Sequence, residues 1–433
     1  KAGAGNDTFR FEGNKLTSDD TVLGEAGTDT IIFTDGIDTF DDSNMTNVKT
    51  IESIKFSDVS GQTFNYGDKS KASGATTLDA SAVTSDFTLD SSALTADNNL
   101  NFIGGSGADT FKTKSANLKS TDVFNGNGGT DILAITDAAS VVDTSFTNIK
   151  NVETLQLGDF TNSVTLASQF GLSGIVNING GTGIDTIDMA NVSSAKAYNI
   201  SSGDGADVIT MKSSIFGSIT GRTVTIDGGA DSDTVTIADK ASLVDTAFVG
   251  KSNLEIIELG NFAGNSISLG SNATTAGIVQ VDGSSMTTAS SYATIDTLNM
   301  TSDKTMTLKG GAGNDTFIVQ TDHLTTDDTI TGGAGTLDKL VVSGSGTEDL
   351  GDVDFTNVTG VEILAFASGA NYTATLATEA IQAGIVNVDI SALASTNNAS
   401  ITASAYTAGL NLKVTGGAGN DTITSGAGND TIT

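Results

Sequence analysis

Short runs of apolar residues recur along the chain, and turns rich in Gly, Asn and Asp separate them. Four such runs are TDTIIFT at 28–34, VETLQL at 152–157, DTVTIAD at 233–239 and DTFIVQT at 315–321. Because β-branched residues dominate and the apolar positions alternate or run on for only a few residues, the pattern predicts short strands. Two segments, LASQFGL at 166–172 and LATEAIQAG at 376–384, are long enough for two helical turns each.

The strand pattern belongs to a long internal repeat. The segment TNVKTIESIKF at 46–56 returns as TNIKNVETLQL at 147–157, VGKSNLEIIEL at 249–259 and TNVTGVEILAF at 356–366. Within it, one acidic column is formed by Glu52, Glu153, Glu255 and Glu362. Each unit opens with a Gly-Asp turn, such as GAGND at 3–7. We therefore divide the chain into units 1–103, 104–201, 202–309 and 310–415, followed by the start of a further unit at 416–433.

A shorter spacing divides each unit into coils. Asp29 follows Asp7 at the same interval at which Asp131 follows Asp109, and Glu52 follows Asp29 at nearly that interval. Short strands at coil-length intervals predict an all-β fold, namely an elongated parallel β-solenoid (a β-helix or β-roll) of about four ~100-residue repeats. A string of four separate β-sandwiches is the alternative. The Gly-Asp turns at one-coil intervals favour the solenoid.

Composition removes several classes of function. Among 433 residues there are 52 acidic and 20 basic ones, a net charge of -32, with no Cys, Pro or Trp and a single His. A disulfide framework and a Cys/His zinc site are excluded. Nucleic acid and anionic lipid would be repelled by this charge, and no apolar run is long enough to predict a membrane span. Acidity at this level suggests disorder, but 37% hydrophobic residues can supply a core.

The Gly-Asp turns carry the candidate chemistry. In GGAGNDTFI at 310–318, the glycines leave backbone carbonyls free to point inward, and Asp315 adds a carboxylate. These are hard oxygen donors, which suit Ca²⁺ with its six to eight oxygen ligands. A single turn offers too few donors. We expect two turns stacked one coil apart to complete a shell.

The same turns carry a family resemblance. GGSGADTFK at 104–112, GGTGIDTID at 180–188, GGAGNDTFI at 310–318 and GGAGNDTIT at 416–424 follow the pattern GGxGxDxUx. This pattern resembles the calcium-binding nonapeptide of the RTX (repeats-in-toxin) β-roll family over about a quarter of the chain. The resemblance implies that Asp side chains and turn carbonyls bind several calcium ions between coils. The residues to which it assigns this role are Asp7, Asp29, Asp109, Asp131, Asp185, Asp207, Asp233, Asp315, Asp338, Asp421 and Asp430, with Asn6, Asn314 and Asn420 beside them.

The chain departs from the family pattern in one respect. Only Asp421 and Asp430 keep the tandem spacing of consecutive nonapeptides. We therefore expect scattered calcium ions along one edge of the solenoid. For the Glu column we expect an outward strand position, with a ligand row or a lateral contact as alternatives. We expect His323, which falls in no repeat column, to be a solvated loop residue.

The function that follows is structural. The acidic residues are spread at repeat spacing and no coil is specialised, so we expect no enzymatic activity. The long coils and the four-fold unit resemble RTX-bearing surface-layer or matrix proteins of Gram-negative bacteria and cyanobacteria. We therefore predict a calcium-stabilised structural protein of the bacterial cell exterior that self-assembles into a surface layer, sheath or extracellular filament. An adhesin stalk, or a non-catalytic RTX segment of a larger type I-secreted protein, is the alternative.

The partners and the location follow from the same arguments. Solenoids need polar terminal caps, and GAGNDT occurs near both ends without one. We expect either a longer chain or end-to-end joining of copies. Copies of the chain itself are the expected partners, a cell-surface polysaccharide is a second candidate, and neither nucleic acid nor membrane insertion is expected. The resemblance implies type I secretion and an extracellular, cell-surface location.

Overall fold

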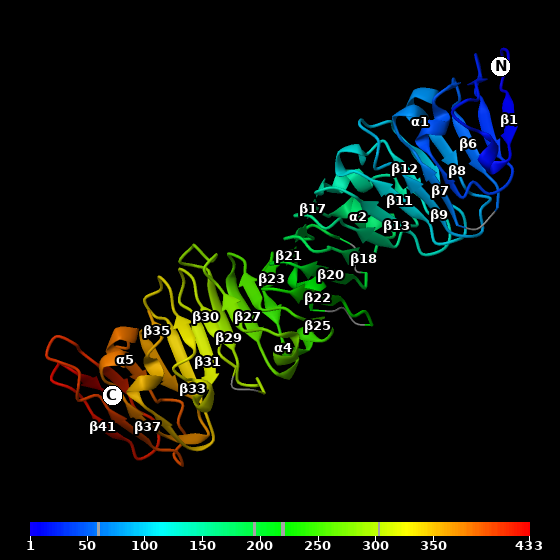
Figure 1. The fold of residues 1–433 in the computed structure, drawn as a ribbon. Coiled ribbons are helices and arrows are strands. Elements are labelled where there is room, and N and C mark those ends of the chain that lie inside the picture. Colours follow the sequence, from blue (N-terminus) through cyan, green and yellow to red (C-terminus); the bar gives the residue numbers. More distant parts are fainter. Residues whose placement is uncertain (59–60, 194–195, 218–220, 302–303) are drawn as a thin grey trace. The chain divides into compact units, whose positions relative to one another are not determined.

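The computed structural model describes residues 1–58, 61–193, 196–217, 221–301 and 304–433. The chain forms a parallel β-solenoid, in which short strands stack as successive rungs (Figure 1). It divides into two compact units, the first made of Lys1–Ile209 with Val224–Asp231 and the second of Thr210–Thr223 with Ser232–Thr433. Each unit is described by itself.

The first unit contains strands of four sheets, and two of these sheets supply most of its strands. In order of pairing, one sheet contains β1 (Thr8–Phe11), β3 (Thr30–Phe33), β6 (Ser53–Phe56), β8 (Thr77–Asp79), β10 (Asn101–Ile103), β12 (Val123–Asn125) and β15 (Ile149–Lys150). The other contains β4 (Thr39–Phe40), β7 (Gln62–Asn65), β9 (Phe87–Asp90), β11 (Thr110–Thr113), β13 (Ile132–Ile135), β16 (Thr154–Gln156), β18 (Asn177–Asn179), β20 (Asn199–Asp204) and β22 (Thr225–Ala230). The smaller groups are β14 (Ser140–Val141), β17 (Ser163–Thr165) and β19 (Thr186–Asp188), and β2 (Val22–Leu23) with β5 (Val48–Lys49).

The second unit repeats this arrangement. One sheet contains β23 (Thr234–Ile237), β26 (Ile256–Leu259), β28 (Gln280–Asp282), β30 (Thr307–Lys309), β32 (Thr329–Thr331) and β35 (Val358–Thr359). A second contains β24 (Ser242–Leu243), β27 (Ala263–Ser268), β29 (Tyr292–Asp296), β31 (Thr316–Gln320), β33 (Lys339–Ser343), β36 (Ile363–Phe366), β38 (Asn387–Asp389), β40 (Lys413–Thr415) and β42 (Thr431–Ile432). A third contains β34 (Gly346–Leu350), β37 (Ala370–Thr375), β39 (Ala399–Thr402) and β41 (Thr422–Thr424). The strand β25 (Lys251–Ser252) also belongs to this unit, and β21 (Val208–Met211) begins in the first unit and ends in the second.

Strand register confirms the solenoid and excludes the string of β-sandwiches. Neighbouring strands pair in parallel, for example Thr110 opposite Thr88 and Ile132 opposite Thr110, each one coil further along the chain. Parallel pairing one coil apart is the geometry of a solenoid, whereas the sandwich is antiparallel. The coil shortens to the length of two nonapeptides where Lys413 lies opposite Thr431.

The core is a narrow column of stacked apolar side chains. Leu89, Phe111, Leu133 and Leu155 occupy matched positions on consecutive strands, and all are buried. Period-two alternation sends every second side chain inward, which is why very short runs suffice to fill the column. All four strand runs predicted from the apolar pattern are present as β3, β16, β23 and β31.

Short helices recur once in each sequence repeat. They are α1 (Asp68–Ser73), α2 (Ser168–Ser173), α4 (Ser271–Ala276) and α5 (Thr378–Ala383). Each ends at a glycine with φ between 100° and 106° (Gly74, Gly174, Gly277 and Gly384), the left-handed C-cap conformation. Both predicted helices are therefore confirmed. The sequence analysis missed α1 and α4, because KSKAS and SNATTA lack apolar periodicity.

Each of these helices packs on a 3-10 helix of the preceding coil. The 3-10 partners are η2 (Asp42–Met45), η4 (Asp143–Phe146), η5 (Asp245–Phe248) and η7 (Asp352–Phe355). The carboxylate of Asp143, the first residue of η4, accepts the backbone N–H groups of Ala167, Gln169 and Phe170 at 2.7 to 3.0 Å. It thereby caps α2 from the neighbouring coil. Asp352 caps α5 in the same way. Elsewhere lie α3 (Ser213–Phe216), η1 (Gly13–Lys15), η3 (Ser115–Asn117) and η6 (Thr321–His323).

Within the described residues, no helix is both long enough and apolar enough to cross a bilayer.

Candidate metal centre

Acidic side chains form rows that run from coil to coil. In the first unit, the backbone N–H of Asp109 donates to Asp131 Oδ1 at 2.7 Å, and the N–H of Asp131 donates to Glu153 Oε2 at 2.8 Å. Asp7 and Asp29 are joined in the same way at 2.8 Å, and Glu52 closes that row at 2.7 Å. Each residue lies directly before a strand, so parallel stacking places one carboxylate above the next. We call such a series a carboxylate row.

The second unit contains the same arrangement. The N–H of Asp315 donates to Asp338 Oδ1 at 2.7 Å, and the N–H of Asp338 donates to Glu362 Oε2 at 2.8 Å. Asp233 and Glu255 form a further pair at 2.8 Å. A carboxylate row therefore recurs in each unit, and in each of these rows a glutamate follows the aspartate.

The Gly-Asp turn is what buries the aspartate. In two full nonapeptides, the N–H of the second glycine donates to the second carboxylate oxygen of the same turn, from Gly105 to Asp109 at 2.6 Å and from Gly311 to Asp315 at 2.8 Å. The turn thus folds back over its own side chain. Both aspartates are fully buried. A buried ionised carboxylate is costly unless it is paired, hydrogen-bonded or bound to a cation.

Several row carboxylates lack a partner for one oxygen. Asp185 belongs to a further row of the first unit, because its N–H donates to Asp207 Oδ1 at 2.7 Å. Within the described part of the chain, Oδ2 accepts no hydrogen bond in Asp29, Asp131, Asp185 and Asp338, and all four side chains are buried. Such orphaned acceptors are rare in folded proteins and call for an explanation, a bound ion being one.

A second oxygen faces each of two orphaned acceptors. A Cβ placed on Gly126 would lie 2.1 Å from Asp131 Oδ2 and 2.0 Å from the carbonyl oxygen of Asn151. A Cβ on Gly24 would similarly meet Asp29 Oδ2 at 2.4 Å and the Thr50 carbonyl oxygen at 2.0 Å. A carboxylate and a carbonyl thus converge on a space that only glycine leaves open.

The raised pKa values of the row carboxyls agree with a binding site for a cation. Burial, together with the carboxylates of Asp109 and Glu153, raises the pKa of Asp131 to about 7 against the opposing effect of the bond from the Asp109 N–H. Burial likewise raises the pKa of Asp109, Asp185 and Asp338 to about 6 each. A cation between the oxygens would reverse this shift, because it stabilises the ionised form.

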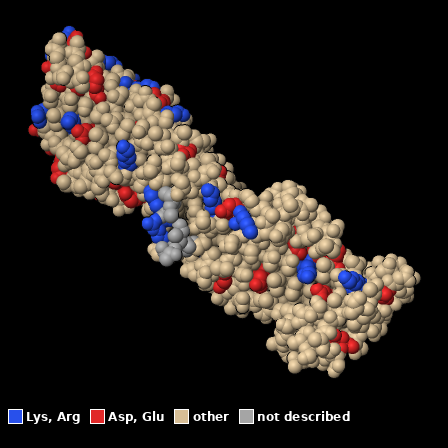
Figure 2. All heavy atoms as spheres, turned by 180° about the vertical axis from the view of Figure 1, so that it is seen from behind, with Lys and Arg blue, Asp and Glu red and all other residues tan. Residues whose placement is uncertain are grey.

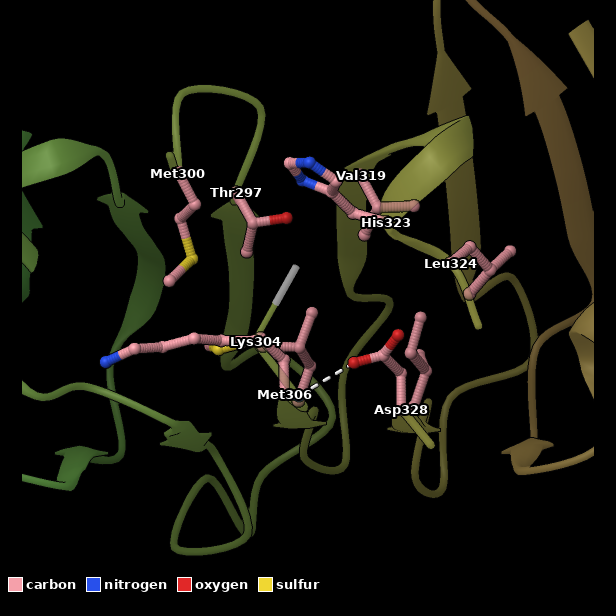
Figure 3. Close-up of a pocket in the computed structure, with 10 residues that line it drawn as sticks. Thr297, Met300, Lys304, Met306, Val319, His323, Leu324 and Asp328 are labelled. Atoms are coloured by element: carbon pink, nitrogen blue, oxygen red, sulfur yellow. Dashed lines mark hydrogen bonds between the residues drawn. The ribbon is translucent and has the colours of Figure 1, made fainter. Parts of the chain in front are cut away.

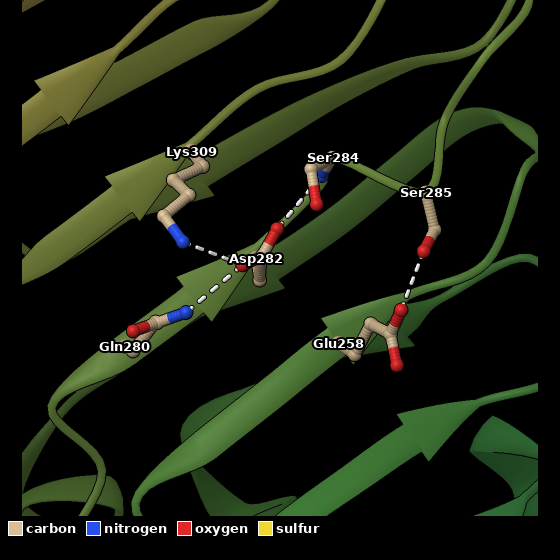
Figure 4. A network of polar contacts seen from close by, with 6 residues as sticks. All are labelled: Glu258, Gln280, Asp282, Ser284, Ser285 and Lys309. Carbon is tan, nitrogen blue, oxygen red and sulfur yellow. Dashed lines mark hydrogen bonds and ion pairs between the residues drawn. The ribbon is translucent and has the colours of Figure 1, made fainter.

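A carboxylate outside the rows, that of Asp282, has hydrogen-bond and ion-pair partners among the neighbouring side chains. Asp282 accepts bonds from Gln280, Ser284 and the Lys309 ammonium, the last at 2.8 Å (Figure 4). Burial opposes ionisation of Asp282, but the bonds from Lys309 and Ser284 outweigh it and hold the pKa of this carboxyl below its ordinary value. The four ion pairs found among the described residues include none of the row aspartates.

The residues present fit a calcium ion. The donors that converge are carboxylate and carbonyl oxygens, without nitrogen or sulfur, and Ca²⁺ prefers such ligands. Among the described residues, no three acidic or His side chains lie close enough together to hold one metal ion. Each ion would therefore take much of its coordination shell from backbone carbonyls and water. Calcium bound there would supply the positive charge that the buried row oxygens lack.

Comparison with known families agrees with this chemistry. A family model described as the RTX calcium-binding nonapeptide repeat, in four copies, matches residues 16–40, 307–319 and 413–433. The chain carries RTX calcium-binding repeats. These repeats are structural calcium-binding units and not catalytic ones. A search of the curated proteins and a search of the solved structures found no match.

The last RTX repeats occupy two different sheets. Asp421 precedes β41 and accepts the N–H of Ala399 at 2.9 Å, whereas Asp430 precedes β42 and accepts the N–H of Leu412 at 2.9 Å. In the first unit the rows that end in Glu52 and Glu153 also precede strands of different sheets. The motif aspartates therefore do not all lie along one edge, whereas the positions of the calcium ions stay a prediction.

The asparagines of the RTX motif act as connectors between turns. Asn6 Oδ1 accepts the N–H of Thr28 at 2.8 Å, and Asn314 Oδ1 accepts those of Thr336 and Leu337 at 3.2 Å. Asn420 donates its own N–H to Asn398 Oδ1 at 2.8 Å. For Asn6 and Asn314 the amide oxygen thus accepts bonds from the neighbouring coil, and a role as calcium ligand remains a prediction for all three asparagines.

The expectations for the Glu column and for His323 need correction. The Glu column does not point outward from strands, because Glu52, Glu153, Glu255 and Glu362 precede their strands and accept bonds from the preceding coil. His323 is not a solvated loop residue, since it is half-buried in η6 and lines a small cavity with Met300 and Met306 (Figure 3).

Sequence reasoning also missed two buried aspartates at the same turn position. Asp122 accepts the N–H groups of Leu100 and Lys119 at 2.8 and 2.7 Å, and burial raises its pKa to about 6. Asp328 bonds to the N–H groups of Met306 and Thr325. Their turns lack the Gly-Asp signature, but the one-coil distance to the bonded residue was available as a signal.

Burial of the row carboxylates also helps to explain why charged side chains are sparse on the face shown in Figure 2. Figure 2 shows charged side chains singly and in small groups over one face, with uncharged atoms covering most of it. The chain nevertheless carries 52 acidic residues. Part of that charge lies inside the turns, where Asp29, Asp109, Asp131, Asp185, Asp207, Asp233, Asp315 and Asp338 are all buried.

Proposed function

We propose that this chain is a calcium-stabilised structural protein of the bacterial cell exterior whose copies assemble into a surface layer, sheath or extracellular filament. The observation that carries the proposal is the carboxylate row, in which buried acidic groups of successive coils lie one above another. Without a cation these groups oppose stacking, so the solenoid would depend on calcium along much of its length. RTX repeats are typical of secreted proteins, and an extracellular medium supplies that calcium.

Recurring exposed apolar side chains support assembly of copies. Val142 and Val244 directly precede η4 and η5 of consecutive repeats and are 54% and 60% exposed. Phe160 and Phe262, one repeat apart, are also exposed. Exposed apolar groups that recur with the repeat suit lateral contacts between identical solenoids, because a contact made by one repeat can be made by the next.

Electron microscopy of the purified chain, with calcium and with EGTA, tests the assembly. We expect ordered sheets or filaments at millimolar calcium and their loss in EGTA. Isolated particles under all calcium conditions would contradict self-assembly and favour a stalk or a segment of a larger secreted protein.

Far-UV circular dichroism tests the calcium dependence separately. We expect the β-sheet spectrum to be lost in EGTA and restored by added calcium. A full β spectrum at submicromolar free calcium would contradict a calcium requirement for folding.

A further inference from the structure

A polar cavity of about 320 Å³ lies in the second unit, away from the carboxylate rows. Its walls come from the ends of β31 and β33 and from β34, and include Gln320, Asp322, Ser345 and Glu348. None of the residues that line it is Lys, Arg or His. Two carboxylates thus share one cavity without a cationic side chain.

Glu348 is the buried acid of this cavity. Only 8% of its surface is exposed. Its Oε1 accepts the N–H of Ser345 at 2.7 Å, whereas Oε2 accepts no hydrogen bond from the residues that the structure describes. Gly344 makes room for it, because a Cβ there would lie 2.3 Å from Glu348 Cδ.

The same position in other repeats does not hold a buried acid. Glu348 lies four positions before Asp352, the residue that caps α5. In two other repeats the residue four positions before the capping aspartate is an alanine, and both alanines, Ala139 and Ala241, are buried. In the first repeat the equivalent residue, Asp38, is exposed. A buried carboxylate is costly without compensation, so the fold alone gives no reason for a buried acid at this place in one repeat only.

The donors around the cavity are oxygens. Besides the two residues with carboxylates, the lining residues include Gln320 with an amide oxygen and Ser345 with a hydroxyl. The Gln320 amide nitrogen donates to the carbonyl oxygen of Leu298, so the amide oxygen of Gln320 takes no part in this bond. Oxygen ligands without nitrogen or sulfur suit Ca²⁺ and disfavour zinc or copper.

We propose that Glu348 and Asp322 bind a calcium ion in this cavity, at a site outside the RTX nonapeptide pattern. The cavity exceeds the size of a bare ion, so water completes the shell. The site is separate from the nearest carboxylate row. Asp315 and Asp338 precede β31 and β33, whereas Gln320 and Ser343 are the last residues of those strands. The proposal therefore does not rest on calcium in the rows.

Tyr372 provides a local reporter for the experiment. It lies directly opposite Glu348 in the parallel ladder between β34 and β37, and its hydroxyl donates to the Ala367 carbonyl at 3.0 Å. Neighbouring strands are about 4.8 Å apart, so a terbium ion bound by Glu348 would lie within reach of energy transfer from this phenol. Tb³⁺ commonly replaces Ca²⁺ at oxygen sites, because both are hard cations.

The experiment compares terbium emission and calcium stoichiometry in the full chain. Glu348→Gln should lose one bound calcium and the emission sensitised by Tyr372. Tyr372→Phe should lose the same emission but keep the calcium count. Asp322→Asn, a change at an exposed residue that leaves folding intact, should weaken calcium binding at this site at least tenfold.

The controls separate this site from the rows. Asp338→Asn should lower the calcium count of the row while the Tyr372-dependent emission stays, which shows that the two sites fail independently. An unchanged calcium count and unchanged emission in both Glu348→Gln and Asp322→Asn would overturn the proposal. If Glu348→Gln fails to fold, the Asp322→Asn and Tyr372→Phe results decide it.

Discussion

The Glu153 carboxylate accepts the backbone N–H of Asp131 from the preceding coil at 2.8 Å, and thereby continues a row of aspartates with a glutamate. Asp131 in turn accepts the N–H of Asp109 at 2.7 Å. The row is thus a hydrogen-bonded series in which each residue uses one carboxylate oxygen for its neighbour. The second oxygen of Asp131 accepts no hydrogen bond from the described residues and is therefore available to a cation.

Replacing Asp131 by Asn should stabilise the calcium-free protein and remove a calcium ion. The amide oxygen can still accept the Asp109 N–H, while the amide nitrogen can donate to the Asn151 carbonyl that now faces Oδ2. One added hydrogen bond contributes about 1 kcal/mol. Urea unfolding in EGTA and calorimetric calcium titration measure the two effects.

A matched control for this change is Asp137→Asn, just beyond the next strand. Asp137 Oδ1 accepts the N–H of Ser115 and lies outside the rows. The calcium stoichiometry of this variant should equal that of the parent chain. An equal loss of calcium in both variants would contradict the assignment of Asp131.

Calcium-free stability should fall as the pH rises from about 4 to about 7. The carboxyls of Asp109, Asp131, Asp185 and Asp338 have a pKa of about 6 to 7 when folded, against 3.8 for an ordinary aspartate. The folded state therefore holds protons that the unfolded state has released, so deprotonation favours unfolding in this window. Urea unfolding in EGTA at a series of pH values measures the effect.

Calcium affinity should change in the opposite direction over the same window. Binding needs the ionised carboxylate, so protons compete with calcium and the affinity should rise with pH until about pH 7. A calcium affinity that is constant between pH 5 and pH 7.5 would show that these carboxyls do not bind the ion.

Gly126→Ala should both destabilise the solenoid and abolish one calcium site. The new methyl group would lie 2.1 Å from Asp131 Oδ2 and 2.0 Å from the Asn151 carbonyl oxygen. Overpacking of this kind costs about 1–3 kcal/mol. Gly128→Ala is the control, because the nearest atom to its Cβ is 3.9 Å away. Comparable unfolding midpoints for the two variants would refute the proposal that the space beside Gly126 is closed to any side chain.

Asp143→Ala should destabilise the fold without changing the calcium count. It removes the carboxylate that accepts the N–H groups of Ala167, Gln169 and Phe170 at the start of α2. Loss of a helix cap costs about 1–2 kcal/mol. Asp159→Ala, at an exposed position, serves as the control in urea unfolding. The capping role fails if both variants unfold at the same denaturant concentration.

Much of the architecture follows from local patterns. The runs at 28–34 and 315–321 predicted β3 and β31, since alternating β-branched residues need a pleated, half-buried surface whatever lies around them. The Gly-Asp turns predicted where carboxylate and carbonyl oxygens occur together, because a glycine-rich turn and its acid are contiguous in the chain. The helices α1 and α4 could not be predicted because their own segments lack apolar periodicity, and the carboxylates that cap them, Asp42 and Asp245, lie a whole coil earlier.

The sequence by itself determined the strand spacing, the repeat and the oxygen chemistry of the turns, all of which depend on residues near one another in the chain. Only the tertiary structure decided that Glu153 continues a row, that the rows occupy both turns of a coil, and that Glu348 is buried beside a cavity. The physical reason is stacking. Each carboxylate meets its partners about one coil away, where the register between strands, and not the local sequence, sets the distance.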